Sequence, residues 1–142
     1  NYLQIENIGY SGSILWTMNV EEECLDYPIP KFLLQPLVEN SILHSRANQA
    51  QTPLQIDVSI HKENNFLHII VRDNGSGIEP ETLQTLQDAL AADSLERGKI
   101  GFGLGNVNRR LKLFYGSSYG LQIRSVPGCT ENVIRLPIAI LW

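Results

Sequence analysis

The positions of apolar residues along the chain predict both strands and helices. In residues 54–60 every second residue is apolar, which predicts a strand with one buried face. The apolar stretch "NFLHIIV" follows after the polar residues "HKENN", so the two segments predict a β-hairpin. A further strand is predicted over residues 14–20, "ILWTMNV". Near the C-terminus, "YGLQIRSV" and "TENVIRLPIAI" predict two strands that are joined by a Pro-Gly turn.

Three other segments have apolar residues at helical spacing. Residues 30–45 predict a helix, in which Pro36 is expected to produce a local kink because it lacks a backbone N–H. Residues 80–93 predict a second helix, with a proline in its first turn. Residues 105–116 predict a third helix, which Gly116 ends. The apolar stripe of this third helix is expected to comprise Val107, Leu111 and Phe114.

This order of elements mixes strands and helices, and its connections are mostly of the hairpin type. It predicts an α+β fold, a two-layer sandwich in which helices cover one face of a mixed, mostly antiparallel sheet. We expect residues 1–13 to be the end of an upstream linker and residues 14–142 to form one domain.

The composition is that of a globular protein, since 43% of the 142 residues are hydrophobic and 18% are charged. The net charge of −4 argues against sequence-independent binding of nucleic acid, which requires a basic surface. Cys24 and Cys129 are far apart and are expected to be reduced thiols. His61 and His68 are expected to be strand residues without a chemical role.

Glycines are concentrated just before the third predicted helix, at Gly101, Gly103 and Gly105. They would leave backbone N–H groups accessible where a helix N-terminus presents its own unpaired donors, and this combination favours a phosphate group. The pattern lacks the Lys-Ser/Thr of a P-loop, and a glycine-rich hinge is the alternative interpretation.

A second candidate is Asp73, which ends the apolar strand "LHIIV" and precedes Gly75 and Gly77. A turn at Asn74-Gly75 is the simpler interpretation. A carboxylate at the end of so apolar a strand could also accept a hydrogen bond from an exocyclic amine, such as that of adenine.

A third candidate is Asn40, which shares a helix face with Leu43 and His44 away from the apolar stripe. Its amide oxygen is a candidate ligand for Mg²⁺, and a solvated surface position is the alternative.

Taken in order, "LVENSILH", "DNGSG", "GFGLGN" and "GCT" resemble the ATP-binding catalytic domain of bacterial two-component sensor histidine kinases. This domain (HATPase_c) belongs to the GHKL superfamily, which includes Hsp90, DNA gyrase and MutL. The segments "IPKFLLQPLVENSILH" and "NVNRRLKLFYG" are most similar to the LytS/YesM-like group. The resemblance covers most of the chain and implies the GHKL (Bergerat) ATP-binding fold.

The resemblance also implies roles for individual residues. Asn40 would coordinate Mg²⁺, Asp73 would bind the adenine amino group, and Thr130 would support the adenine through its hydroxyl. Glu39, beside Asn40, would orient the catalytic site. The implied contacts with ATP are Asn40, His44, Asp73, Gly75, Gly77, Ile78, Gly101, Phe102, Gly103, Leu104, Gly105 and Thr130.

The chain departs from the family at several positions. ATP-hydrolysing relatives carry a glutamate four residues before the metal-binding asparagine, where this chain has Pro36. The resemblance therefore implies phosphoryl transfer to a partner in place of hydrolysis. Family members often have a lysine at the position of Leu43 and glycines at those of Ser45 and Cys129.

The implied reaction is donation of the γ-phosphate of ATP to a histidine on an upstream dimerisation domain, for relay to a response regulator. The acceptor segment is expected to lie outside this chain. The resemblance implies ATP and Mg²⁺ as cofactors and the cytoplasmic part of a membrane-anchored bacterial homodimer. The alternatives are a GHKL ATPase or anti-sigma-type serine kinase, and a degenerate nucleotide-binding module with a regulatory role.

Overall fold

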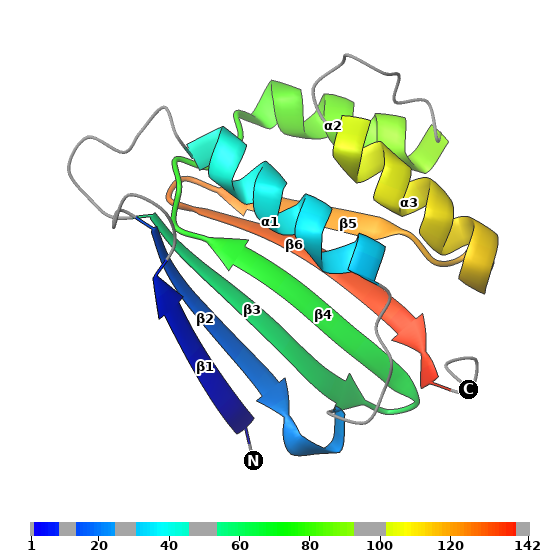
Figure 1. Ribbon diagram of the computed structural model, residues 1–142. Coiled ribbons are helices and arrows are strands. Elements are labelled where there is room, and N and C mark those ends of the chain that lie inside the picture. Colours follow the sequence, from blue (N-terminus) through cyan, green and yellow to red (C-terminus); the bar gives the residue numbers. More distant parts are fainter. Residues whose placement is uncertain (1, 9–13, 25–30, 46–53, 93–101, 139–142) are drawn as a thin grey trace.

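The computed structural model describes residues 2–8, 14–24, 31–45, 54–92 and 102–138. Their elements, in chain order, are β1 (Tyr2–Ile8), β2 (Ile14–Glu21), the short 3-10 helix η2 (Glu22–Cys24), α1 (Lys31–Ser45), β3 (Leu54–Glu63), β4 (Phe66–Asp73), α2 (Pro80–Ala92), α3 (Phe102–Tyr115), β5 (Leu121–Val126) and β6 (Cys129–Pro137). The three α-helices lie on one face of the sheet (Figure 1). The predicted two-layer α+β sandwich is therefore confirmed. Among the described helices, none is long and apolar enough to cross a membrane.

The sheet has six strands in the order β1-β2-β3-β4-β6-β5. β2 and β3 are parallel, and every other neighbouring pair is antiparallel. The predicted mixed, mostly antiparallel sheet is therefore confirmed. The two predicted hairpins are present. The β3–β4 turn contains Asn64 with a φ of 58°, and the β5–β6 turn contains Gly128 with a φ of 86°. Asparagine and glycine adopt this left-handed conformation at low cost, which permits both tight turns.

The core lies between the helices and the inner face of the sheet. The inner residues of β3 and β4 are at most 4% exposed and comprise Leu54, Ile56, Val58, Ile60, Leu67, Ile69, Val71 and Asp73. The helices contribute the buried residues Leu33, Leu37, Leu86, Leu90, Leu104, Val107 and Leu111. Burial of one such apolar side chain stabilises the fold by about 1.5–3 kcal/mol. Asp73 is the one ionisable residue in these inner rows.

The apolar stripe of α3 differs in part from the prediction. Val107 and Leu111 are buried as expected, whereas Phe114 is 66% exposed. Tyr115 packs against the core in its place, because four-residue steps from Val107 lead through Leu111 to this position. Gly116, with a φ of 113°, follows the end of the helix as predicted.

Residues Tyr2–Ile8 form the edge strand β1, which pairs with β2. They fall in the stretch 1–13 that we assigned to an upstream linker. The start of the ATP-binding domain at residue 14 stays a prediction.

The outer face of the sheet is polar, which is typical of an antiparallel sheet with one solvated side. Asp57, Arg72, Glu131 and Arg124 are neighbours on β3, β4, β6 and β5, so their charges alternate across the sheet. Arg72 donates a hydrogen bond from Nε to Glu131 (2.6 Å), and this bond raises the pKa of Arg72.

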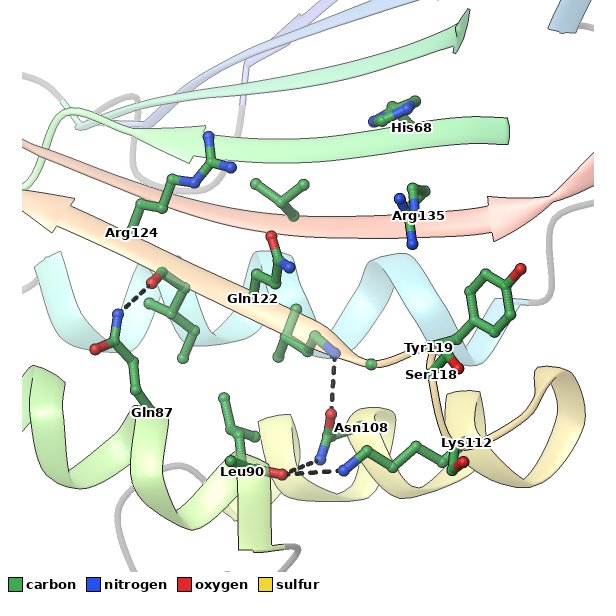
Figure 2. A pocket seen from close by; sticks show the side chains of 16 residues that line it. His68, Gln87, Leu90, Asn108, Lys112, Ser118, Tyr119, Gln122, Arg124 and Arg135 are labelled. Carbon is green, nitrogen blue, oxygen red and sulfur yellow. Dashed lines mark hydrogen bonds between the residues drawn. The ribbon is translucent and has the colours of Figure 1, made fainter. Parts of the chain in front are cut away.

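β5 forms the other edge of the sheet, and two helices cover its outward-facing backbone groups. Asn108 of α3 accepts a hydrogen bond from the N–H of Leu121 (2.9 Å), and Gln87 of α2 donates one to the carbonyl of Ile123 (2.9 Å) (Figure 2). The buried Asn108 also donates to the carbonyl of Leu90 (2.9 Å). Asn108 thereby links α2, α3 and β5.

Candidate functional site

Asp73 is the last residue of β4, and its side chain lies on the helix-covered face of the sheet. It is 4% exposed, and its Oδ1 accepts a hydrogen bond from the N–H of Gly75 (3.0 Å). Thr130 lies directly opposite on β6. An ionised carboxylate only accepts hydrogen bonds. When it is buried, each hydrogen bond that it accepts offsets part of the cost of removing it from water. This position is therefore suited to a donor group of a ligand.

The loop of residues 74–78 after Asp73 is held against the β5–β6 hairpin. The N–H of Ile78 donates to Ser125 Oγ (2.7 Å), and the N–H of Gly128 donates to the Ser76 carbonyl (3.3 Å). Gly77 has a φ of 84°, and a Cβ placed there would lie 2.4 Å from the Val126 carbonyl oxygen. A glycine at position 77 is thus required by close packing on β5, whatever contact it makes with a ligand.

Thr130 belongs to a short chain of hydrogen bonds. Its hydroxyl lies 2.9 Å from Ser125 Oγ, on the strand position directly opposite. Because Ser125 also accepts from Ile78, it connects Thr130 to the loop 74–78. The sequence analysis missed Ser125, although the two-residue turn of the predicted hairpin would have paired it with Thr130.

Asn132 is the second residue that the sequence analysis missed. It lies two positions after Thr130 on the same face of β6, opposite Val71 of β4. Its side chain is fully buried, and neither Oδ1 nor Nδ2 has a hydrogen-bond partner in the part of the chain that is described. Leaving a buried polar group unsatisfied costs about 1–3 kcal/mol, so such groups are rare without a ligand or water. The alternation of "TENVIRLP" already indicated that Asn132 and Thr130 share a face.

The predicted metal ligand Asn40 is half-buried on α1, a helix that packs against β4 and α3. Its neighbour Glu39 is exposed and accepts a hydrogen bond from Gln35 one turn earlier (2.9 Å). The next residue, Ser41, is buried, and its hydroxyl has no partner among the described residues. The side chain of His44 lies outside the described part of the structure.

The glycine-rich stretch is placed differently from the prediction. α3 begins at Phe102, three residues earlier than expected, so Gly103 lies in its first turn and not in a loop before it, and Gly105, the first residue of the predicted helix, lies in the same turn. The first four N–H groups of a helix have no partner within it. Among the described residues of α3 these are the N–H groups of residues 102–104, which include the buried Leu104. Gly101 lies outside the described residues.

Several of the elements that carry these residues reach the same end of the sheet (Figure 1). β4 ends there, β6 begins there, and the loop 74–78 lies between them; the C-terminal end of α1 is at the same end (Figure 1). The sheet offers a buried carboxylate, a hydroxyl and an amide. The helical layer offers the amide of Asn40 and the N-terminus of α3. Such a set can bind a ligand that combines a hydrogen-bonding base with an anionic group.

A separate hollow of about 740 Å³ lies along β5 (Figure 2). Its lining includes His68 and Arg135 from the outer face of the sheet and Asn108 and Lys112 from α3. Asp73 and the two inner β6 residues described above do not line it. The hollow follows the edge of the sheet and is not the site described above.

Comparison with known families identifies the chain. The family model of histidine kinase-, DNA gyrase B-, and HSP90-like ATPases matches residues 26–140. The chain belongs to this family. It is also similar to the sensor histidine kinase/phosphatase LytS of Staphylococcus aureus strains Mu50 and N315, with 39% identity over 137 residues. The match covers 96% of this chain and 23% of each relative, so the chain spans about a quarter of their length. The resemblance to the sensor histidine kinases of the LytS-like group is thereby confirmed.

Solved structures agree on the fold. The blue-light activated histidine kinase of Erythrobacter litoralis EL346 superposes with a TM-score of 0.61 at 15% identity, covering 89% of this chain and 36% of that chain. The catalytic domain of the histidine kinase ThkA gives a TM-score of 0.59 at 13% identity, covering 88% and 80%. Both likenesses concern the fold, and they match the two-layer sandwich described above.

Proposed function

We propose that this chain is the ATP-binding catalytic domain of a sensor histidine kinase. In this proposal it binds ATP with Mg²⁺ and donates the γ-phosphate to a histidine on a dimerisation domain of the same protein. The observation that supports it most directly is the buried carboxylate of Asp73, which shares the inner face of the sheet with Thr130 and with Asn132, whose amide has no partner in the described part of the chain.

The adenine base would bind at this inner face. Asp73 can only accept, so it suits the exocyclic amine of adenine. The amide of Asn132 offers one acceptor and one donor group, and the base edge or a water beside it would satisfy them. Ile78 and Gly75 would border the base, because the loop 74–78 is held against the same strands.

The phosphates would lie at the N-terminus of α3. The N–H groups and the partial positive charge of this helix end favour an anion, and Gly103 and Gly105 add no side chain to its first turn. Asn40 would hold Mg²⁺ through its amide oxygen, since Mg²⁺ binds few protein oxygens and keeps the rest for water and phosphate. When bound, Mg²⁺ neutralises charge on the phosphates.

Transfer to a partner is favoured over hydrolysis by the residues of α1. Pro36 stands inside this helix, one turn before Asn40, and a proline cannot activate a water molecule. The exposed Glu39 accepts a hydrogen bond from the side chain of Gln35. We therefore infer that the γ-phosphate reaches a nucleophile supplied from elsewhere.

The partners follow from the relatives, which are named sensor histidine kinases or kinase/phosphatases. By analogy, the histidine acceptor domain would precede this chain, and a response regulator would receive the phosphoryl group. The whole protein would be a membrane-anchored homodimer with this domain in the cytoplasm. No nucleic acid is expected to bind, in line with the net charge of −4.

Two measurements test the proposal. Calorimetric titration of the chain with ATP in Mg²⁺ should give saturable binding, with little release of inorganic phosphate. Addition of the protein's own dimerisation domain should then produce acid-labile phosphohistidine from radiolabelled ATP. Absence of ATP binding would refute the proposal. Rapid phosphate release by the chain alone would favour the ATPase, and binding without histidine labelling would favour the regulatory module.

A further inference from the structure

His61 and His68 form a cross-strand pair on the outer face of the sheet. They are directly opposite each other on β3 and β4, near the hairpin turn. Their rings are stacked, with centroids 5.1 Å apart and an angle of 8° between the planes. Since the strand register fixes this pairing, the two imidazoles are held together by the backbone.

A carboxylate completes the cluster. Glu63 lies two residues after His61, which places it on the same face of β3. Its Oε2 is 3.7 Å from His61 Nε2. One ligand atom from each of His61, Glu63 and His68 lies within 4.8 Å of the other two. All three come from one hairpin, so a bound ion would bridge β3 and β4.

The electrostatic surroundings contain both favourable and opposing groups. Burial, and secondly the proximity of His61, lower the pKa of His68. Arg135, opposite His68 on β6, opposes a cation. Its guanidinium lies over the ring of Phe66, 4.5 Å from the centroid, which gives the arginine a partner of its own.

We propose that His61, Glu63 and His68 form a binding site for a divalent transition-metal ion, with Zn²⁺ as the probe. Two imidazoles and a carboxylate are ligands that suit Zn²⁺, Cu²⁺ and Ni²⁺. Zinc takes N and O ligands at about 2.0–2.2 Å in a tetrahedral arrangement, so its ligand atoms lie about 3.3–3.6 Å apart. Small side-chain rotations bring the three atoms into this range, and water completes the coordination.

This site is separate from the proposed nucleotide site. Its ligands are on the outer face of the sheet, whereas Asp73 and Asn132 are on the inner face, under the helices. Failure of one proposal would therefore leave the other unaffected.

The test is calorimetric titration of the chain with Zn²⁺, under reducing conditions and without chelating buffers. One ion should bind saturably. His68→Asn and Glu63→Gln should each weaken binding, and His68→Asn by at least about tenfold, the lower limit seen even for second-shell partners. Glu81→Gln, which changes an exposed carboxylate on α2, is the matched control and should bind like the unsubstituted chain. Glu63 is exposed at the hairpin end, so its substitution leaves the core intact.

A second readout does not depend on variants. In spectra of the ¹⁵N-labelled imidazoles, Zn²⁺ should shift the signals of two of the three histidines. The proposal is overturned if no saturable binding occurs at millimolar Zn²⁺. It is equally overturned if His68→Asn binds as tightly as the unsubstituted chain, because the ion would then be held elsewhere, for example by a thiol.

Discussion

Asp73 and Thr130 lie directly opposite each other on β4 and β6, and they are 4% and 7% exposed. Thr130 is tied through Ser125 to the loop that follows Asp73. The polar groups proposed for base recognition are therefore carried by adjacent strands of the sheet, whose register fixes their separation. Side chains held on such rigid elements are positioned more accurately than side chains on loops.

Replacing Asp73 by asparagine should weaken ATP binding. Loss of a hydrogen bond to a charged group costs about 1.5–3 kcal/mol, which is about ten- to a hundredfold in affinity. The amide oxygen can still accept from Gly75, so the loop should keep its conformation. Calorimetric titration measures the affinity. Asp57→Asn, on the outer face of β3, is the matched control and should bind ATP normally. Equal affinity of folded Asp73→Asn and the unsubstituted chain would show that Asp73 does not bind the base.

Replacing Asn132 by valine should stabilise the chain when no nucleotide is present. It removes a buried amide that has no hydrogen-bond partner among the described residues, and the expected gain in the free energy of unfolding is about 1–3 kcal/mol. Urea denaturation measures this gain. The same variant should bind ATP more weakly, because the base would lose a polar neighbour. A decrease in stability would indicate that a buried water already satisfies Asn132 in the free protein.

Replacing Asn40 by alanine should weaken ATP binding in Mg²⁺ but change it little in EDTA, because the amide is proposed to act through the metal. Parallel titrations under the two conditions measure the difference. Gln35→Ala, at an exposed position five residues earlier on α1, is the control. Equal losses with and without Mg²⁺ would assign Asn40 a structural role.

Cys24 and Cys129 are free thiols, as the sequence predicted. Burial, and secondly the charge of Glu131, raise the pKa of the Cys129 thiol. A higher pKa leaves a smaller fraction of reactive thiolate at any given pH. Alkylation of Cys129 by iodoacetamide should therefore be slower than that of a free small thiol, and its rate should rise at a higher pH. In Cys129→Ser, the 2% exposed Cys24 should not react while the chain is folded. A rate profile equal to that of the small thiol would contradict this account.

Replacing Asn108 by alanine should destabilise the chain. It leaves the Leu121 N–H without this partner, and an unsatisfied buried group costs about 1–3 kcal/mol, whereas the Leu90 carbonyl still accepts a hydrogen bond from Lys112 Nζ. Thermal or urea unfolding measures the loss. Asn106→Ala, which changes an exposed asparagine of the same helix, should be nearly neutral. Replacing Gly120 by alanine should also destabilise the chain, because a Cβ there would lie 2.7 Å from Asn108 Oδ1.

Much of the fold could be predicted from local patterns. The alternation in residues 54–60 identified the buried face of β3, and the Pro-Gly dipeptide identified the β5–β6 turn. These features depend on residues that are close in sequence. The start of α3 was misplaced because Gly103 has a low helix propensity, which the surrounding packing overrides.

The site was only partly predictable, because several of its features depend on which strands are neighbours. Asp73 and Thr130 were each singled out, but only the pairing of β4 with β6 places them opposite each other. Asn132 became notable when its burial and lack of partners were known. The pairing of His61 with His68 likewise requires the register of the hairpin, and single residues do not reveal it.

The hydrogen bonds that join Asn108 and Gln87 to β5 affect how two copies of this domain can meet. An edge strand with free backbone groups is a template on which another chain can add a strand, and this leads to aggregation. In β5, the N–H of Leu121 and the carbonyl of Ile123 are already occupied by side chains of the same molecule. A second copy of this domain would therefore find these two groups already bonded, which disfavours the addition of a strand along this part of the edge.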